Sequence, residues 1–257
     1  MVLEWILGAT VAVSLISLVG LLVLGLRENV QKIFLFYSVA FAAGTMLGAA
    51  FFDLLPESLK AIDAATALPV CLAGIMAFFI VEKYISWHHH HETHDNAGRK
   101  RRARQAEEKP MGYLNLVGDG LHNFFDGVAI AASFMVGLPL GITTTLVIAL
   151  HEVPQEMGDF GLLLYSGFSR RKAIAFNLLT ALTCVLGALL FYFAAPLVQN
   201  LEGLGLAFTA GGFIYIAGSD LFPEFHRETD FKKSVWQLLL IFAGIALIWL
   251  VVGRLGG

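Results

Sequence analysis

The chain has 257 residues, of which 57% are hydrophobic and only 14% charged, with a formal net charge of −3 and a mean hydropathy of +0.73. Soluble domains carry about 25% charged residues, so this composition excludes a soluble globular protein. It offers no basic surface for nucleic acid. The two cysteines, Cys71 and Cys184, lie in different apolar stretches, which excludes a disulfide framework. We therefore expect an integral membrane protein surrounded by a lipid bilayer.

Eight apolar stretches are long enough to cross the hydrocarbon core as helices, which takes about 20 residues each. They lack the strict alternation of barrel strands, so the expected fold class is all-α. No basic segment precedes the first stretch and no cleavage site follows it, so we expect a retained helix in one transmembrane domain, residues 1–257. The predicted spans cover residues 5–26, 33–55, 68–87, 111–136, 140–166, 172–195, 203–225 and 235–253.

The basic residues lie almost entirely on one side of these spans. Of the 17 lysines and arginines, 15 fall on that side, and only Lys60 and Arg254 fall on the other. Basic loops tend to stay in the cytoplasm. We therefore expect both termini to be extracytoplasmic and the long connection at 88–110 to be cytoplasmic.

That connection opens with a cluster of imidazoles and continues with a basic run, residues 99–104. Five imidazoles and two carboxylates within eight residues suit weak binding of a borderline metal ion. The alternative is a solvated linker whose basic run only helps to set the orientation. The imidazoles belong to His88, His89, His90, His91 and His94.

Residues 40–57 and 207–224 form an internal repeat, AFAAGTMLGAAFFDLLPE against AFTAGGFIYIAGSDLFPE, with nine identities in 18 positions. The predicted topology sends the two copies through the membrane in opposite directions, as in secondary transporters that work by alternating access. Spans at 5–87 and 172–253 would then be inverted repeats around a central pair at 111–166. The alternative is one helix pattern that recurs because of composition alone.

The central pair carries polar residues at helical spacing, which places most of them on one face of each helix. The connection at 137–140 is so short that the two helices must be antiparallel neighbours, with His122 and His151 near the middle of the bilayer. Ionisable groups at that depth cost about 2.5–3.5 kcal/mol each, so they usually mark a functional path. The polar set comprises Asn115, Asp119, His122, Asn123, Asp126, His151, Glu152, Gln155, Glu156 and Asp159.

Imidazole, carboxylate and amide donors together suit Zn²⁺, Fe²⁺, Mn²⁺ or Co²⁺, so we expect the two faces to hold a divalent metal ion. For any single residue the alternative is a helix-to-helix hydrogen bond. Pro154 frees the carbonyl of Leu150 and favours a kink there. The stretch HEVPQ also compares with the zincin signature H-E-x-x-H, but Gln155 stands where the second histidine is required. We expect no enzyme, and an intramembrane zinc metalloenzyme is the alternative.

The motifs HNFFDG at 122–127 and HEVPQEMGDF at 151–160 resemble the paired signatures of the ZIP (Zrt/Irt-like protein) family of divalent metal transporters. The match is to the subgroup with HNFxDG and HExPHExGD, and the eight spans, outside termini and His-rich loop agree with it. The resemblance implies uptake of Zn²⁺ into the cytosol, or of Fe²⁺, Mn²⁺, Co²⁺ or Cd²⁺. It also implies a 3+2+3 helix arrangement in a homodimer. The small size and short loops favour the plasma (inner) membrane, and an organelle membrane is the alternative.

The resemblance also assigns metal ligands by position. Gln155 departs from the subgroup, which commonly has histidine there, and a neutral amide oxygen is expected to lower affinity or broaden the preference toward Mn²⁺ or Fe²⁺. Some relatives complete a two-metal site with an acidic residue of the sixth span; residues 172–195 contain no carboxylate, which argues against a second, adjacent metal site. The assigned ligands are His122, Asn123, Asp126, His151, Glu152 and Gln155.

Two further acidic pairs lie where the copies of the repeat end. Asp53 and Glu57 are near the outer end of the second span, and Asp220 and Glu224 are near the inner end of the seventh. We expect the first pair to attract cations at the entrance and the second to receive them at the exit. The alternative is that all four only cap helix ends in solvent. Protons compete with metal for histidine and carboxylate ligands, so transport should depend on pH.

Overall fold

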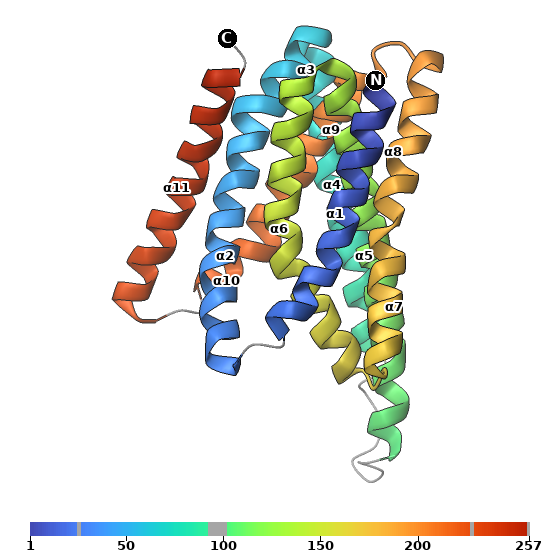
Figure 1. Ribbon diagram of the computed structural model, residues 1–257, viewed down its shortest axis with the longest axis vertical. Helices are drawn as coiled ribbons and strands as arrows, with labels where there is room; N and C mark the ends of the chain where they lie inside the picture. The colour runs from blue at the N-terminus through green and yellow to red at the C-terminus, as the bar shows by residue number, and fades with distance from the viewer. Residues whose placement is uncertain (25–26, 92–101, 227–228, 256–257) are drawn as a thin grey trace.

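The computed structural model describes the backbone of residues 1–24, 27–91, 102–226 and 229–255. Regular structure in these ranges is helical throughout, with no strand among them, which confirms the predicted all-α class. The helices run alongside one another in one bundle, with both termini at the same end (Figure 1). Helix α5 (Arg102–Val136) begins at the opposite end of the bundle (Figure 1).

Each predicted span falls on helical structure, although several spans are divided into shorter elements. The first three correspond to α1 (Val2–Leu24), to α2 (Glu28–Ala49) with η1 (Ala50–Leu54) and α3 (Leu55–Ala61), and to α4 (Ala64–His91). The central pair is α5 and α6 (Leu138–Tyr165). The last three are α7 (Arg170–Ala181) with α8 (Thr183–Ala194) and η2 (Ala195–Leu197), then α9 (Leu201–Ile216) with η3 (Ala217–Leu221) and α10 (Phe222–His226), and finally α11 (Phe231–Leu255).

Within the described ranges, five helical segments are long and apolar enough to cross a membrane, and a shorter apolar helix covers Val2–Ile16. Helices α5 and α6 are not among the five, because they carry the polar and charged residues of the central pair. This is the architecture of a multi-pass membrane protein. The five segments are Asn29–Ala61, Ala64–Lys83, Arg170–Leu197, Leu201–Ser219 and Phe231–Arg254.

The long connection is shorter than the sequence predicted. Helix α4 continues to His91 and α5 already begins at Arg102, so the interval 88–110 is helical at both ends. Residues 102–109 consist of arginine, alanine, glutamine, glutamate and lysine, all good helix formers, and a helix extends readily once its apolar part is formed. The part of the connection that the structure describes is therefore helical. His94 lies outside the described residues, as do the side chains of His88 to His91.

Three pairs of helices approach so closely that only glycine fits between them. At six glycines, an added Cβ would lie 1.8–2.5 Å from a backbone carbonyl oxygen of the partner helix, closer than any real side chain comes. Small residues allow such close backbone packing between membrane helices. The pairs are α2 with α11 through Gly44 and Gly244, α4 with α9 through Gly74 and Gly211, and α5 with α8 through Gly127 and Gly187.

The pairs α2 with α11 and α4 with α9 pack in the same way. Gly44 faces the carbonyl of Ile241 in α11, and Gly211, which follows Gly44 by 167 residues, faces the carbonyl of Cys71 in α4. The π-helical turns η1 and η3 begin 167 residues apart as well, and each lies just before a proline, Pro56 or Pro223. Proline cannot donate to the carbonyl four residues earlier, and a widened turn accommodates the missing bond. The two copies in the sequence therefore share both their local distortion and their packing contacts.

Candidate metal centre

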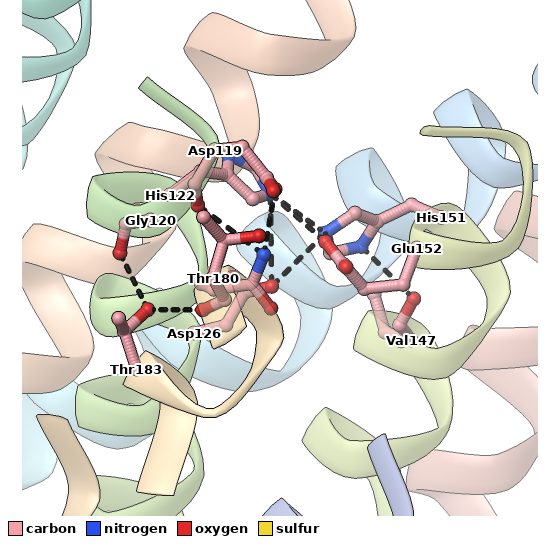
Figure 2. A network of polar contacts seen from close by, with 10 residues as sticks. Asp119, Gly120, His122, Asp126, Val147, His151, Glu152, Thr180 and Thr183 are labelled. Carbon is pink, nitrogen blue, oxygen red and sulfur yellow. Dashed lines mark hydrogen bonds and ion pairs between the residues drawn. The ribbon is translucent and has the colours of Figure 1, made fainter. Parts of the chain in front are cut away.

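Four side chains of the central helices meet at one buried point (Figure 2). Helix α5 contributes His122 and Asp126, one helical turn apart, and α6 contributes His151 and Glu152. We call these four residues the quartet. Asp126, His151 and Glu152 are each at most 2% exposed, and the His122 side chain is 11% exposed. Helical spacing on two adjacent antiparallel helices brings the four together at one depth.

The quartet has the dimensions of a tetrahedral metal site. Nε2 of His122 lies 3.3 Å from Nε2 of His151, 3.3 Å from Oε1 of Glu152 and 3.6 Å from Oδ2 of Asp126. Nε2 of His151 lies 3.4 Å from the Asp126 oxygen and 3.6 Å from the Glu152 oxygen. Zinc bonds of about 2.0–2.1 Å in a tetrahedron separate neighbouring ligand atoms by about 3.3–3.4 Å. These five separations lie within about 0.3 Å of those expected around one such ion, and the sixth, between the Asp126 and Glu152 oxygens, is at most 4.8 Å.

The backbone fixes the orientation of His151. Its Nδ1 lies 3.1 Å from the carbonyl oxygen of Val147, one turn earlier on α6 (Figure 2). A carbonyl oxygen only accepts, so Nδ1 must carry the proton and donate it. Nε2 is then the atom with the free lone pair, and it faces the quartet, as is usual for histidines that bind metal.

Two oxygens of the quartet have no hydrogen-bond partner. Oδ2 of Asp126 and Oε1 of Glu152 are both buried and accept no hydrogen bond within the described part of the chain, and each lies 3.3–3.6 Å from the two histidine Nε2 atoms, with which it pairs only if an imidazole is protonated. Buried carboxylate oxygens normally accept hydrogen bonds or pair with a cation, because leaving them bare costs several kcal/mol. A divalent ion at the centre of the quartet would satisfy both oxygens at once.

Asn123 and Gln155 lie differently from the other predicted ligands. The Asn123 amide nitrogen donates to Oδ1 of Asp119 over 2.8 Å, and the Asn123 amide oxygen is buried without a hydrogen-bond partner among the described residues. Gln155 is one turn beyond His151 and lines the cavity beside it.

A cavity of about 320 Å³ reaches the quartet from one side. His122 and His151 line its deep end, with the polar residues Asn115, Asp119 and Asp159. Aromatic rings enclose the quartet: Phe78 packs edge-on against His122 at 6.0 Å between ring centroids, and Phe213 against His151 at 5.7 Å. We call this space the inner cavity.

A second hollow, of about 450 Å³, lies toward the opposite end of α6 and is lined by Asp53, Glu57, Lys60 and Thr143. We call it the outer hollow. It stops short of the quartet, since Thr143 precedes His151 by eight residues, roughly 12 Å along the helix. Side chains with no exposed surface fill the bundle around that interval: Met46, Leu54, Ile130, Val147 and Ile148.

The structure describes the side chains of the predicted entrance pair, Asp53 and Glu57, but not those of the predicted exit pair. Oδ2 of Asp53 is buried without a partner, and Glu57 accepts a hydrogen bond from Lys60 over 2.6 Å. The Lys60 contact was missed in the sequence, although the spacing of three residues on a helix allows it. Asp220 lies in η3 and Glu224 in α10, but their side chains are outside the described residues.

Another contact that the sequence did not predict joins α6 to α7. The Asn177 amide donates to the carboxylate of Glu156, and both side chains are buried. An amide inside an otherwise apolar predicted span was the available signal, because such a group needs a partner at that depth. Its partner was not predictable from spacing, since the two residues lie on different helices.

Comparison with known proteins consistently finds zinc transporters. A family model described as ZIP zinc transporter matches residues 2–110 and 85–251. The chain is 32% identical over 332 residues to a rat protein named zinc transporter SLC39A7, covering 95% of this chain and 71% of the rat protein. It is 31% identical over 283 residues to the yeast zinc transporter YKE4, covering 95% of this chain and 80% of that protein.

A Caenorhabditis elegans protein named zinc transporter zipt-7.2 is 42% identical over 147 residues, which cover 56% of this chain and 32% of the worm protein. The chain thus spans between a third and four fifths of the length of these three relatives. All three printed names are those of transporters, and none is that of an enzyme.

Proposed function

Because this chain belongs to the ZIP zinc transporter family, we propose that it carries zinc through the membrane into the cytosol, with the quartet as the binding site in the middle of the path. One observation carries the assignment of the site: four metal-binding atoms converge, buried, at the end of an open cavity. A catalytic zinc site would leave a coordination position for water. A transport site must instead be reached in turn from each side of the membrane.

Of the predicted ligands, we assign direct binding to His122, Asp126, His151 and Glu152. Asn123 and Gln155 act as supporting groups. Asn123 holds Asp119 beside the quartet, and Gln155 presents an amide in the inner cavity close to the path of the ion. Iron, manganese, cobalt and cadmium are further candidate substrates, since borderline divalent ions share these donors.

We assign an inverted-repeat topology with eight spans, the repeats at 5–87 and 172–253 and the central pair at 111–166. The offset of 167 residues supports it, because the sequence identities, the starts of the π-helical turns and the glycines Gly44 and Gly211 all follow that offset. The bias of lysine and arginine to one side supports extracytoplasmic termini. On this assignment the inner cavity opens to the cytoplasm and the outer hollow to the exterior, which makes the conformation inward-facing and favours alternating access.

Asp53 and Glu57 are proposed to concentrate cations in the outer hollow, where Lys60 already pairs with Glu57. Asp220 and Glu224 would receive the ion at the inner side. We further propose a homodimer in the plasma (inner) membrane, and a cytoplasmic His-rich segment that captures metal without being required for transport. Deleting residues 88–95 should leave most zinc flux intact, whereas a sensor that signals through this segment would lose its function.

The site assignment is tested with radiolabelled zinc in vesicles that contain the purified protein. His151→Ala and Asp126→Ala each remove one donor of the tetrahedron, so uptake should fall close to the level of empty vesicles. The exposed carboxylate of Glu4 offers a control, and Glu4→Ala should transport normally. Wild-type uptake by either quartet variant would rule out this assignment.

A further inference from the structure

We propose a second cation site in the inner cavity, built from the oxygens of Asp119, Asp159 and Asn115, which accepts the divalent ion after it leaves the quartet. We call these three residues the inner station. The proposal rests on the proposed function, because it takes the quartet as the site that feeds it.

All three residues line the same cavity as His122 and His151. Asp119 and Asn115 precede His122 on α5 by one and two helical turns, and Asp159 follows His151 on α6 by two turns. Since the two helices are antiparallel, both steps run the same way along the bundle, away from the outer hollow. An ion that moves from the quartet into the cavity therefore passes these side chains next.

In each carboxylate of the inner station, one oxygen accepts a hydrogen bond from an amide and the other has no hydrogen-bond partner. Oδ1 of Asp159 accepts from the Asn115 amide over 3.0 Å, and Oδ1 of Asp119 accepts from Asn123 over 2.8 Å. Oδ2 of both aspartates is buried without a hydrogen-bond partner, and Asp119 is only 5% exposed. The amides orient the carboxylates and leave one ligand oxygen on each of them.

Neither aspartate forms an ion pair in the described part of the chain, and the positive group that attracts both of them is His122 of the quartet when its imidazole is protonated. The carboxylates of Asp119 and Asp159 repel each other, and the carboxylate of Glu152 repels both of them. Buried like charges are costly, and a cation between them removes that cost. Glu156 is not included, because it is bonded to Asn177 and does not line the cavity.

The chemistry of the inner station differs from that of the quartet. Its donors are all oxygens, and among the described residues only the quartet brings three or more His, Cys, Asp or Glu ligands within 4.8 Å of one another. The cavity of about 320 Å³ is large enough to hold several waters beside an ion. The inner station should therefore hold an ion that keeps part of its water shell, more loosely than the quartet, and should favour Mn²⁺ relative to Zn²⁺.

This difference allows a test with the full chain purified in detergent. One equivalent of zinc is bound first to fill the quartet, and Mn²⁺ is then titrated while electron paramagnetic resonance reports the free ion. The wild type should take up a further Mn²⁺, and Asp119→Asn and Asp159→Asn should each lose that uptake. Asp63→Asn is the matched control, because it makes the same change at an exposed helix cap where asparagine serves as well.

Zinc binding by the aspartate variants shows whether they are folded, and it should stay at the wild-type level. Mn²⁺ uptake that persists in both variants, or that is missing in the zinc-loaded wild type, would overturn the inner station. Failure of the proposed function has a different signature: His151→Ala would then bind zinc as the wild type does. The two proposals can therefore fail separately.

Discussion

At the scale of single residues, Gln155 is the position where metal preference can be changed. It lines the inner cavity one turn beyond His151, and its amide is a neutral, weak ligand. Gln155→His would add a third imidazole near the quartet. We expect this variant to bind zinc more tightly relative to Mn²⁺, because imidazole suits zinc better than an amide oxygen does. Competition between the two ions for the purified protein measures the ratio, with Gln155→Asn as the control; an unchanged ratio would contradict the prediction.

The sequence predicted the residues of the quartet but not the direction of every side chain. His122 and Asp126 are four residues apart and share a helical face, which follows from spacing, whereas their meeting with His151 followed from the short connection that makes α5 and α6 antiparallel neighbours. Asn123 is one residue after His122 and therefore points about 100° further around the helix. Its contact with Asp119 depends on which face of α5 meets α6, and a pattern of polar residues does not fix that rotation.

At the scale of helices, the glycines of the close pairs limit what the bundle tolerates. A Cβ at Gly127 would lie 1.8 Å from the carbonyl oxygen of Cys184, so Gly127→Ala must push α5 and α8 apart. Overpacking of this kind costs about 1–3 kcal/mol. We expect a lower thermal unfolding temperature in detergent for this variant. Gly161→Ala is the control, because nothing lies within 4 Å of its added Cβ. A control that unfolds earlier than Gly127→Ala would contradict this interpretation.

The repeat makes a second prediction about helices. Gly44 and Gly211 occupy matching positions, and their added Cβ atoms would lie 2.1 and 2.0 Å from the carbonyls of Ile241 and Cys71. If the two halves share one packing plan, Gly44→Ala and Gly211→Ala should lower the unfolding temperature by similar amounts. A large loss for one and none for the other, in the same detergent, would show that only one of the two contacts is required.

Periodicity and length placed a predicted span on each of the main helical stretches, but not the breaks inside them or the polar extensions beyond them. Nothing in the apolar pattern marks the end of α7 at Ala181, because the residues on both sides are equally suited to a span. The π-helical turns η1 and η3 could have been anticipated from the prolines that follow them. The helical start of α5 was missed since polar composition and helix propensity gave opposite indications there, and propensity prevailed.

At the scale of the whole molecule, the two hollows are predicted to face opposite sides of the membrane. Val81 lines the inner cavity and Val136 the outer hollow, and replacing the two native cysteines, both buried, by alanine gives a background without other thiols. In that background, Val81→Cys should react with a membrane-impermeant thiol reagent only from the cytoplasmic face. Val136→Cys should react only from the exterior. Reaction of both from the same face would contradict the orientation.

Transport requires the quartet to open toward the outer hollow as well, and Val147 lies in the interval that must open. It is fully buried, one turn from Thr143 at the hollow and one turn from His151 in the quartet. Val147→Cys should therefore be unreactive from the exterior in the inward-facing conformation and become reactive when the outward-facing conformation is visited. We expect its rate of modification from outside to rise during zinc flux and to fall when Asp126→Ala is added, because that variant cannot bind the ion that drives the cycle. A channel-like path would give a rate that does not change with flux.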